Sequence, residues 1–170
     1  SEIVVKGGQP VPFKTLDYHE LLAREDVDAV MISASWEAHF PAAIAAMKAG
    51  KITALEVAGA YDIEDCWQLV RTYEETGTPI FFMENCCYNK DELLVSALLK
   101  NGVLGSPSFC QGYYCHDLRE EIITVGLDRH HYRLAEYRDH NCENYPTHEL
   151  GPIAKMLSIN RGNRFTKVVS

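Results

Sequence analysis

The sequence predicts an α/β fold in which helices cover a parallel sheet, followed by a second region of different character. Short apolar runs alternate with segments of helical periodicity from Leu16 to Lys100. Glycine, proline and capping residues separate these segments. After Gly105, aromatic and charged residues replace the pattern. A chain that alternates strand and helix typically forms parallel strands joined by right-handed crossovers.

The first elements are a helix over 16–23 and a buried strand over 27–33. Asp17 is the predicted N-cap of the helix, and Glu20 stands three residues later, at the spacing of a capping box. The run 27–33 is short, apolar and rich in branched residues, which is typical of a buried strand. A helix of small apolar residues is then predicted over 41–48, with a glycine as its stop signal.

Two further strand–helix units complete the sheet. A second buried strand is predicted over 52–57, and the helix after it has Asp62 as its N-cap and Gly77 as its end. A third strand over 79–83 precedes a third helix over 91–100. The sequence therefore predicts three parallel strands in chain order.

The loops at the carboxyl ends of the strands are the candidate binding loops, because ligands of parallel sheets bind there. These loops are 33–39, 56–60 and 84–88. Glu56 and Glu84 each follow an apolar run. A carboxylate at such a place binds ribose or sugar hydroxyls, or instead caps the next helix or faces solvent. The position at a strand end favours the binding role.

The region after the third helix is predicted to open a second domain. The run 109–116 alternates as a strand does, the stretch 119–145 is polar, and an apolar helix is expected over 148–157. We place the domain boundary after residue 103, so that the sheet domain is 1–103 and the second domain begins at 104–170.

Composition and charge exclude some classes of partner. The hydrophobic content of 46% and charged content of 24% are typical of a globular protein, and the net charge of -8 argues against binding to nucleic acid. No apolar run is long enough to span a membrane, and the amino-terminal residues do not resemble a signal peptide. The six cysteines lack Cys-x-x-Cys spacing, so we expect reduced thiols and a cytoplasmic location.

A phosphate-binding glycine loop is missing from the sequence. Gly7 and Gly8 are followed by Pro10, and no Gly-x-Gly-x-x-Gly turn opens a helix. A dinucleotide-binding sheet normally begins with that turn. The chain is therefore predicted to be a fragment of a dinucleotide-binding protein, or else to bind no dinucleotide by the usual route.

Two pairs of tyrosine and histidine are candidates for proton transfer. Tyr114 and His116 are two apart on a predicted strand, so they share one face. Tyr145 and His148 are three apart at a predicted helix start, so they also share a face. Together they offer proton donors and acceptors near neutral pH. The spacing alone favours the alternative, in which the tyrosines pack at a domain seam and the histidines have hydrogen-bond partners or face solvent.

A metal site is not expected, although one stretch is rich in ligands. No pair of these residues has the spacing of a known zinc module, and the histidine pair with its neighbouring arginines is more typical of a solvated loop. The stretch comprises Cys115, His116, Asp117, His130, His131, His140, Cys142 and His148.

Several motifs in order resemble the glucose–fructose oxidoreductase and inositol dehydrogenase superfamily. They are Asp28-Ala-Val, Trp36-x-x-His39, Ala46-x-x-x-Gly50-Lys51, Glu56-Val-Ala and Gly102-Val-Leu-Gly105. This resemblance implies a partial Rossmann-like domain followed by the start of an α+β domain with a mostly antiparallel sheet, which is often an interface in homo-oligomers.

A narrower set of motifs resembles the NAD-dependent retaining glycosidases of that superfamily, of α-N-acetylgalactosaminidase type. The set includes Glu84-Asn85-Cys86, Gly112-Tyr-Tyr-Cys-His116, Tyr145-Pro-Thr-His148 and Ile159-Asn-Arg-Gly162. The resemblance implies NAD as cofactor, a sugar or glycoside as substrate, and oxidation of the sugar 3-hydroxyl before loss of the C2 proton. It implies a catalytic set of Glu84, Tyr114, His116, Tyr145 and His148, and a cofactor-binding set of Ser33, Trp36, His39, Glu56 and Asn85.

Val57 distinguishes between two enzymatic readings. Plain dehydrogenases of the superfamily usually carry a lysine there, which assists proton transfer from the alcohol, and valine cannot do so. This favours a glycosidase that recycles its cofactor over a plain NAD(P)-dependent sugar or polyol dehydrogenase. A third reading is a non-catalytic fragment or scaffold, because the glycine loop and most of the second-domain sheet are absent from the sequence.

Overall fold

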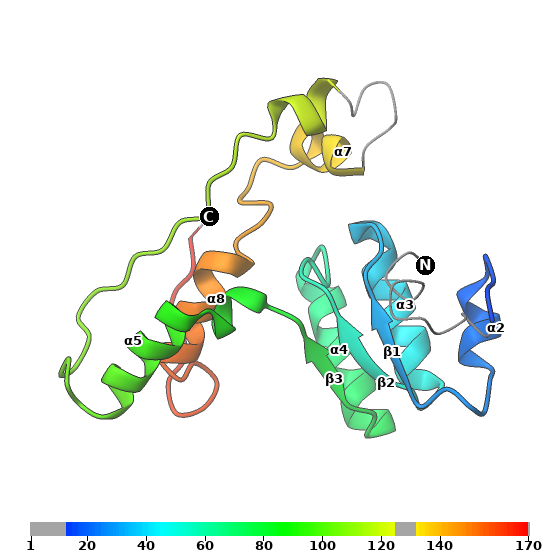
Figure 1. Ribbon diagram of the computed structural model, residues 1–170, viewed down its shortest axis with the longest axis horizontal. Coiled ribbons are helices and arrows are strands. Elements are labelled where there is room, and N and C mark those ends of the chain that lie inside the picture. Colours follow the sequence, from blue (N-terminus) through cyan, green and yellow to red (C-terminus); the bar gives the residue numbers. More distant parts are fainter. Residues whose placement is uncertain (1–12, 125–131, 170) are drawn as a thin grey trace.

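The structure is a computed structural model that describes residues 13–124 and 132–169. Its centre is a sheet of β1 (Ala29–Ile32), β2 (Ile52–Leu55) and β3 (Ile80–Phe82), paired in that order (Figure 1). Both pairings are parallel. The predicted parallel α/β sheet is therefore confirmed.

Two helices cover one face of the sheet (Figure 1). They are α3 (Trp36–Lys48) and α4 (Ile63–Thr76), and α2 (Tyr18–Leu22) packs against α3. Both helices lie on the same face because successive right-handed crossovers run in one direction across a sheet. The core beneath them consists of Leu22, Ile32, Ala43, Ala46 and Leu55.

The other face of the sheet is open among the described residues. Met31, Ala54 and Phe81 are register partners across the three strands, so their side chains share a face. Met31 is 72% exposed and Phe81 is 58% exposed. The strands predicted as buried are thus buried on one side only, because helices of the described chain cover one face and not the other.

Helix caps follow the sequence with one correction. The Asp62 carboxylate accepts a hydrogen bond from the Asp65 amide at 2.8 Å, and α4 ends at Gly77 with a left-handed φ of 66°. Asp17 also caps its helix as predicted. The capping box is wrong, however, because the Glu20 carboxylate accepts from the Thr15 hydroxyl instead of the Asp17 amide.

Helix α3 begins at Trp36, five residues before the predicted start at Pro41. The prediction rested on the run of small apolar residues over 41–48, whereas the residues just before it are mostly aromatic and polar. The helix instead continues through Pro41. As a result, Trp36 and His39 lie on the first turns of a helix and not in a loop.

The second region packs around α8 (Thr147–Met156). The 3-10 turn η1 (Asn85–Tyr88) and helix α5 (Lys90–Lys100) both contact α8, beside which α5 lies in Figure 1. The π-helical turn η2 (Arg119–Thr124) and α7 (Tyr132–Asp139) contact each other. The domain boundary after residue 103 stays a prediction.

The predicted strand over 109–116 is wrong, because this segment is extended but pairs with no strand in the described chain. It passes close to α8 at Gly112. A Cβ atom on Gly112 would stand 2.9 Å from the Cβ atom of Glu149 and 3.2 Å from Cδ1 of Ile153. Only glycine allows this close approach.

Some predictions fall on residues that the structure does not describe. Gly7, Gly8, His130 and His131 lie outside the described residues. Within the described ranges, no helix is both long and apolar enough to cross a membrane. All six cysteines lie within those ranges, and none forms a disulfide.

Candidate active site

Glu84 connects the end of the sheet to α8. It follows β3 and caps η1, where its Oε1 atom accepts a hydrogen bond from the Cys86 amide at 2.9 Å. The same oxygen lies 2.6 Å from Nδ1 of His148. Both side chains of this pair are 7% exposed. The other carboxylate oxygen of Glu84 is buried and has no hydrogen-bond partner among the described residues.

Gly151 allows α8 to approach Glu84. A Cβ atom on Gly151 would stand 2.7 Å from Cγ of Glu84 and 3.3 Å from Sγ of Cys87. The helix carrying His148 is therefore held against the end of β3 at a distance that any larger side chain would prevent.

Two tyrosines surround the His148 ring. The ring centroids of Tyr114 and Tyr145 lie 4.4 Å and 4.8 Å from that of His148, both in edge-on geometry. The His116 ring lies 4.5 Å from Tyr114. The five residues predicted as catalytic therefore lie together in the structure. The extended segment 109–118 brings Tyr114 and His116 there by crossing α8.

Tyr145 also joins this cluster to the sheet domain. Its ring stacks on Trp36 with 5.4 Å between centroids and 17° between planes, and Trp36 is 4% exposed. Burial raises the pKa of Tyr145 to about 12, although the Arg133 charge opposes the shift. The hydroxyl of Tyr145 is thus protonated at neutral pH and able to donate.

Arg133 was predicted to lie in a solvated loop that could face the substrate, and the structure places it on α7 in the aromatic cluster. Its guanidinium carbon lies 4.8 Å from the Trp36 ring centroid and 5.4 Å from that of Tyr145. Tyr132 packs edge-on against Trp36. Arg133 and Tyr132 belong to α7. No local sequence pattern predicts that this helix packs over the start of α3.

A hollow of about 320 Å³ lies at this cluster. Its lining includes Tyr114, His116, Arg133 and Tyr145, so phenol, imidazole and guanidinium groups face one space. This combination offers proton donors, a proton acceptor and a positive charge to a polar ligand. His148, which is paired with Glu84, contacts two of the lining residues, Tyr114 and Tyr145.

The residues predicted to flank the cofactor differ in what they do. His39 is 2% exposed; its Nδ1 donates to the Ala58 carbonyl at 3.0 Å, and its Nε2 accepts from the Ala34 amide at 3.3 Å. Both ring nitrogens thus tie together the loops after β1 and β2. Ser33 and Asn85 are exposed at strand ends, and the Glu56 carboxylate accepts from the Val57 amide at 3.3 Å.

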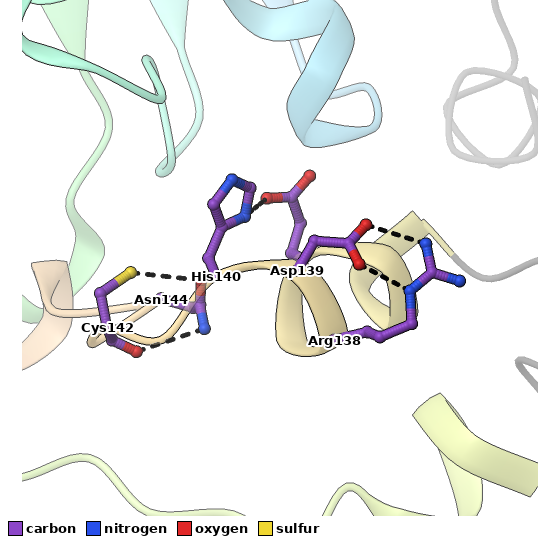
Figure 2. Close-up of polar contacts among 6 residues, drawn as sticks. Arg138, Asp139, His140, Cys142 and Asn144 are labelled. Atoms are coloured by element: carbon purple, nitrogen blue, oxygen red, sulfur yellow. Dashed lines mark hydrogen bonds and ion pairs between the residues drawn. The ribbon is translucent and has the colours of Figure 1, made fainter.

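A larger, mostly apolar cavity of about 620 Å³ lies between α4, β3 and α7. Glu136, His140, Cys142 and Asn144, from α7 and the segment after it, line part of this cavity. Figure 2 shows the polar contacts in this segment, including the Arg138–Asp139 pair and the contact of Cys142 with Asn144. His140 pairs with Glu136 at 2.9 Å. Burial and the Glu136 charge raise the pKa of Tyr61 on the opposite wall.

Residues 88–170 match the family model of the glycosyl hydrolase 109 C-terminal domain. The chain is a relative of the glycosyl hydrolase 109 proteins. It is 38% identical over 171 residues to a glycosyl hydrolase family 109 protein of Shewanella baltica, covering 98% of this chain and 37% of that protein. It is 37% identical to the alpha-N-acetylgalactosaminidase of Shewanella oneidensis, covering 99% of this chain and 38% of that protein.

The chain thus spans little more than a third of the length of these glycosyl hydrolase 109 relatives. Among solved structures, a probable dehydrogenase from Thermotoga maritima is similar over 62% of this chain and 32% of its own, with 25% identity and a TM-score of 0.57. A myo-inositol 2-dehydrogenase from Lactobacillus plantarum shares the fold, with 17% identity, a TM-score of 0.70, and coverage of 91% of this chain and 44% of its own.

The resemblance inferred from the motifs is therefore confirmed. The neighbours are oxidoreductases, and the relatives are carbohydrate-active proteins of glycosyl hydrolase family 109. The chain thus shares the fold of these oxidoreductases and is similar in sequence to these relatives.

Proposed function

We propose that the protein forms the site of an NAD-dependent glycosidase that acts on N-acetylated amino sugars in α linkage and regenerates its cofactor in each turnover. The observation that carries the proposal is the cluster at the end of β3, where the His148–Glu84 pair meets Tyr114 and Tyr145. The name of the relative from Shewanella oneidensis supplies the substrate class.

The residues at the strand ends fit the nicotinamide end of such a cofactor. The unpartnered, buried oxygen of Glu84 suits a hydrogen-bond donor such as a carboxamide or sugar hydroxyl, and Trp36 and Tyr145 offer aromatic surface. When bound, NAD would take up a hydride from the sugar and later return it.

The side chains of the site would move the protons. Glu84 holds Nδ1 of His148, which leaves Nε2 as the nitrogen that exchanges a proton with the substrate. Tyr145 remains protonated well above neutral pH, so it would donate to the departing glycosidic oxygen. Tyr114, which contacts His116 and His148, would relay between the two imidazoles.

Val57 favours this function over a plain dehydrogenase. The side chain is 6% exposed at the end of β2, where it can supply no proton. Oxidation of the sugar 3-hydroxyl would also release a hydroxyl proton, and without a lysine at this position its removal would fall to the tyrosines and histidines of the cluster.

The test starts with the protein as isolated. It is denatured and searched for released NAD by absorbance and mass spectrometry, then assayed with NAD on an aryl α-N-acetylgalactosaminide. Release of the aryl group without net NADH is expected. Net NADH from a free sugar or polyol would support a dehydrogenase instead, and neither activity nor bound NAD would indicate a scaffold.

The first variant to assay is His148→Gln, which keeps a polar side chain of similar size. We expect kcat to fall by about 10²–10⁴-fold, as for loss of a general acid–base group. His19→Gln is the control, since His19 is exposed on α2. An unchanged kcat in His148→Gln would contradict the proposed role.

A further inference from the structure

We infer that Glu84, Cys86 and His148 form a binding site for a soft divalent cation of the zinc type. The site lies where the end of β3, the turn η1 and helix α8 meet. One ligand atom from each residue lies within 4.8 Å of the other two. The sequence predicted no metal site.

The three donors are those that zinc prefers. Zinc binds thiolate sulfur, imidazole nitrogen and carboxylate oxygen, at distances of about 2.0–2.3 Å and in tetrahedral geometry. Tetrahedral ligands at those distances stand about 3.4 Å apart. The most distant donors therefore need to approach by up to about 1.4 Å. Oε1 of Glu84 and Nδ1 of His148, now 2.6 Å apart, need to separate by a little less than about 1 Å if both bind the ion. Three protein ligands leave a fourth position for water.

A second observation points to a cation at the same place. The second oxygen of Glu84 is buried and has no hydrogen-bond partner among the described residues, and Glu84 as a whole is 5% exposed. Burying a carboxylate oxygen without a partner is costly, and a bound cation removes that cost. The three donor atoms and the unpartnered Glu84 oxygen thus both favour a bound cation.

Cys86 is suited to this role more than its neighbour Cys87. Cysteine binds a divalent cation as the thiolate, so binding displaces the thiol proton. A divalent cation offsets the carboxylate charge and stabilises the thiolate. The ion then bonds to sulfur, and the thiol proton passes to solvent. Only Cys86 of the two belongs to the three-residue group.

This inference does not rest on the proposed function. The bound ion would occupy the space of the His148–Glu84 contact, so it would compete with the acid–base role of His148. Binding itself is measured with neither NAD nor sugar present. A failed metal titration therefore leaves the glycosidase proposal intact, and an inactive glycosidase assay leaves the metal site intact.

The experiment titrates the metal-free protein with Co²⁺, which reports its ligands by colour. We expect one ion per chain and a near-ultraviolet absorption band from thiolate-to-cobalt charge transfer, which Zn²⁺ then abolishes by displacement. Cys86→Ser should remove the band. His148→Gln should weaken binding by at least about tenfold, as loss of one ligand in a three-ligand site.

Cys87→Ser is the matched control, because it removes the adjacent thiol and should keep the band. Far-ultraviolet circular dichroism of each variant establishes that it is folded. Absence of the band in the unaltered protein, or its persistence in folded Cys86→Ser, would overturn the inference.

Discussion

At the residue scale, the Glu84 side chain links the end of β3, the turn η1 and helix α8. It caps η1, holds Nδ1 of His148 and leaves one buried oxygen for a ligand. The sequence indicated a carboxylate at a strand end and left open a cap or a binding group. The structure shows that it is a cap and also reaches the candidate site. Its partner His148 is 64 residues away in the chain, a separation that no local pattern reports.

Gly151→Ala tests the close approach of α8 to Glu84. Helical propensity alone predicts that alanine stabilises the helix by about 1 kcal/mol. The new Cβ atom would lie 2.7 Å from Cγ of Glu84, and such overpacking costs about 1–3 kcal/mol. We expect the free energy of unfolding in urea to fall by about 1 kcal/mol. A rise would mean that the helix is not held this close.

Tyr145→Phe tests the burial of the tyrosine hydroxyl. The folded pKa of Tyr145 is about 12, above the unfolded value of about 10, so the folded state keeps the proton longer. The stability contributed by neutral Tyr145 is complete below about pH 10 and is lost as the pH rises through about 12. The free energy of unfolding should therefore fall less steeply over this range in Tyr145→Phe. Equal slopes would contradict the shifted pKa.

At the scale of elements, capping residues were the most informative signals in the sequence. Asp62 and Gly77 set the bounds of α4 within one residue, because a side chain acceptor and a left-handed residue act locally. The start of α3 was missed because Pro41 is tolerated beyond the first turn. The strand predicted over 109–116 does not form, because strand pairing depends on a distant neighbour that the described chain does not supply.

Asp62→Ala tests the N-cap of α4. The Asp65 amide would lose its acceptor, and we expect a loss of about 1 kcal/mol in the free energy of unfolding. Glu75→Ala is the control, because Glu75 is exposed near the other end of α4 and should change stability by less than about 0.5 kcal/mol. Equal effects of the two substitutions would count against the cap.

At the scale of the whole molecule, much apolar surface is exposed. The open face of the sheet carries Met31 and Phe81, and helix α5 exposes Leu93, Leu94 and Val95. Large apolar patches usually mark surfaces that another chain or segment covers. The chain spans 37% of its Shewanella baltica relative, so these surfaces are consistent with a sequence that matches only part of that protein.

The open sheet face should bind an apolar fluorescent dye. Because Met31 and Phe81 are exposed, the double substitution Met31→Lys with Phe81→Lys should leave the fold intact and reduce dye fluorescence by roughly half or more. Gln68→Lys is the control, since it adds a charge at an exposed position of α4 on the covered side of the sheet. A reduction as large in the control would contradict the assignment to the open face.

The candidate site itself was predicted in part. Family motifs identified Glu84, Tyr114, His116, Tyr145 and His148, and the structure brings these side chains together. Arg133 and Tyr132 could not be predicted, because their place depends on where α7 lies and not on neighbouring residues. His39 was predicted beside the cofactor. Its two hydrogen bonds to backbone groups also link the loops after β1 and β2.

The stacking of Trp36 on Tyr145 makes the site observable by light. The sequence has two tryptophans, Trp36 at 4% and Trp67 at 54% exposure. With Trp67 replaced by phenylalanine, all indole emission would come from the seam between sheet and α8. The wavelength and lifetime of this emission would then change if Trp36 and Tyr145 separated. They would also change if a ring of a ligand entered between the two side chains.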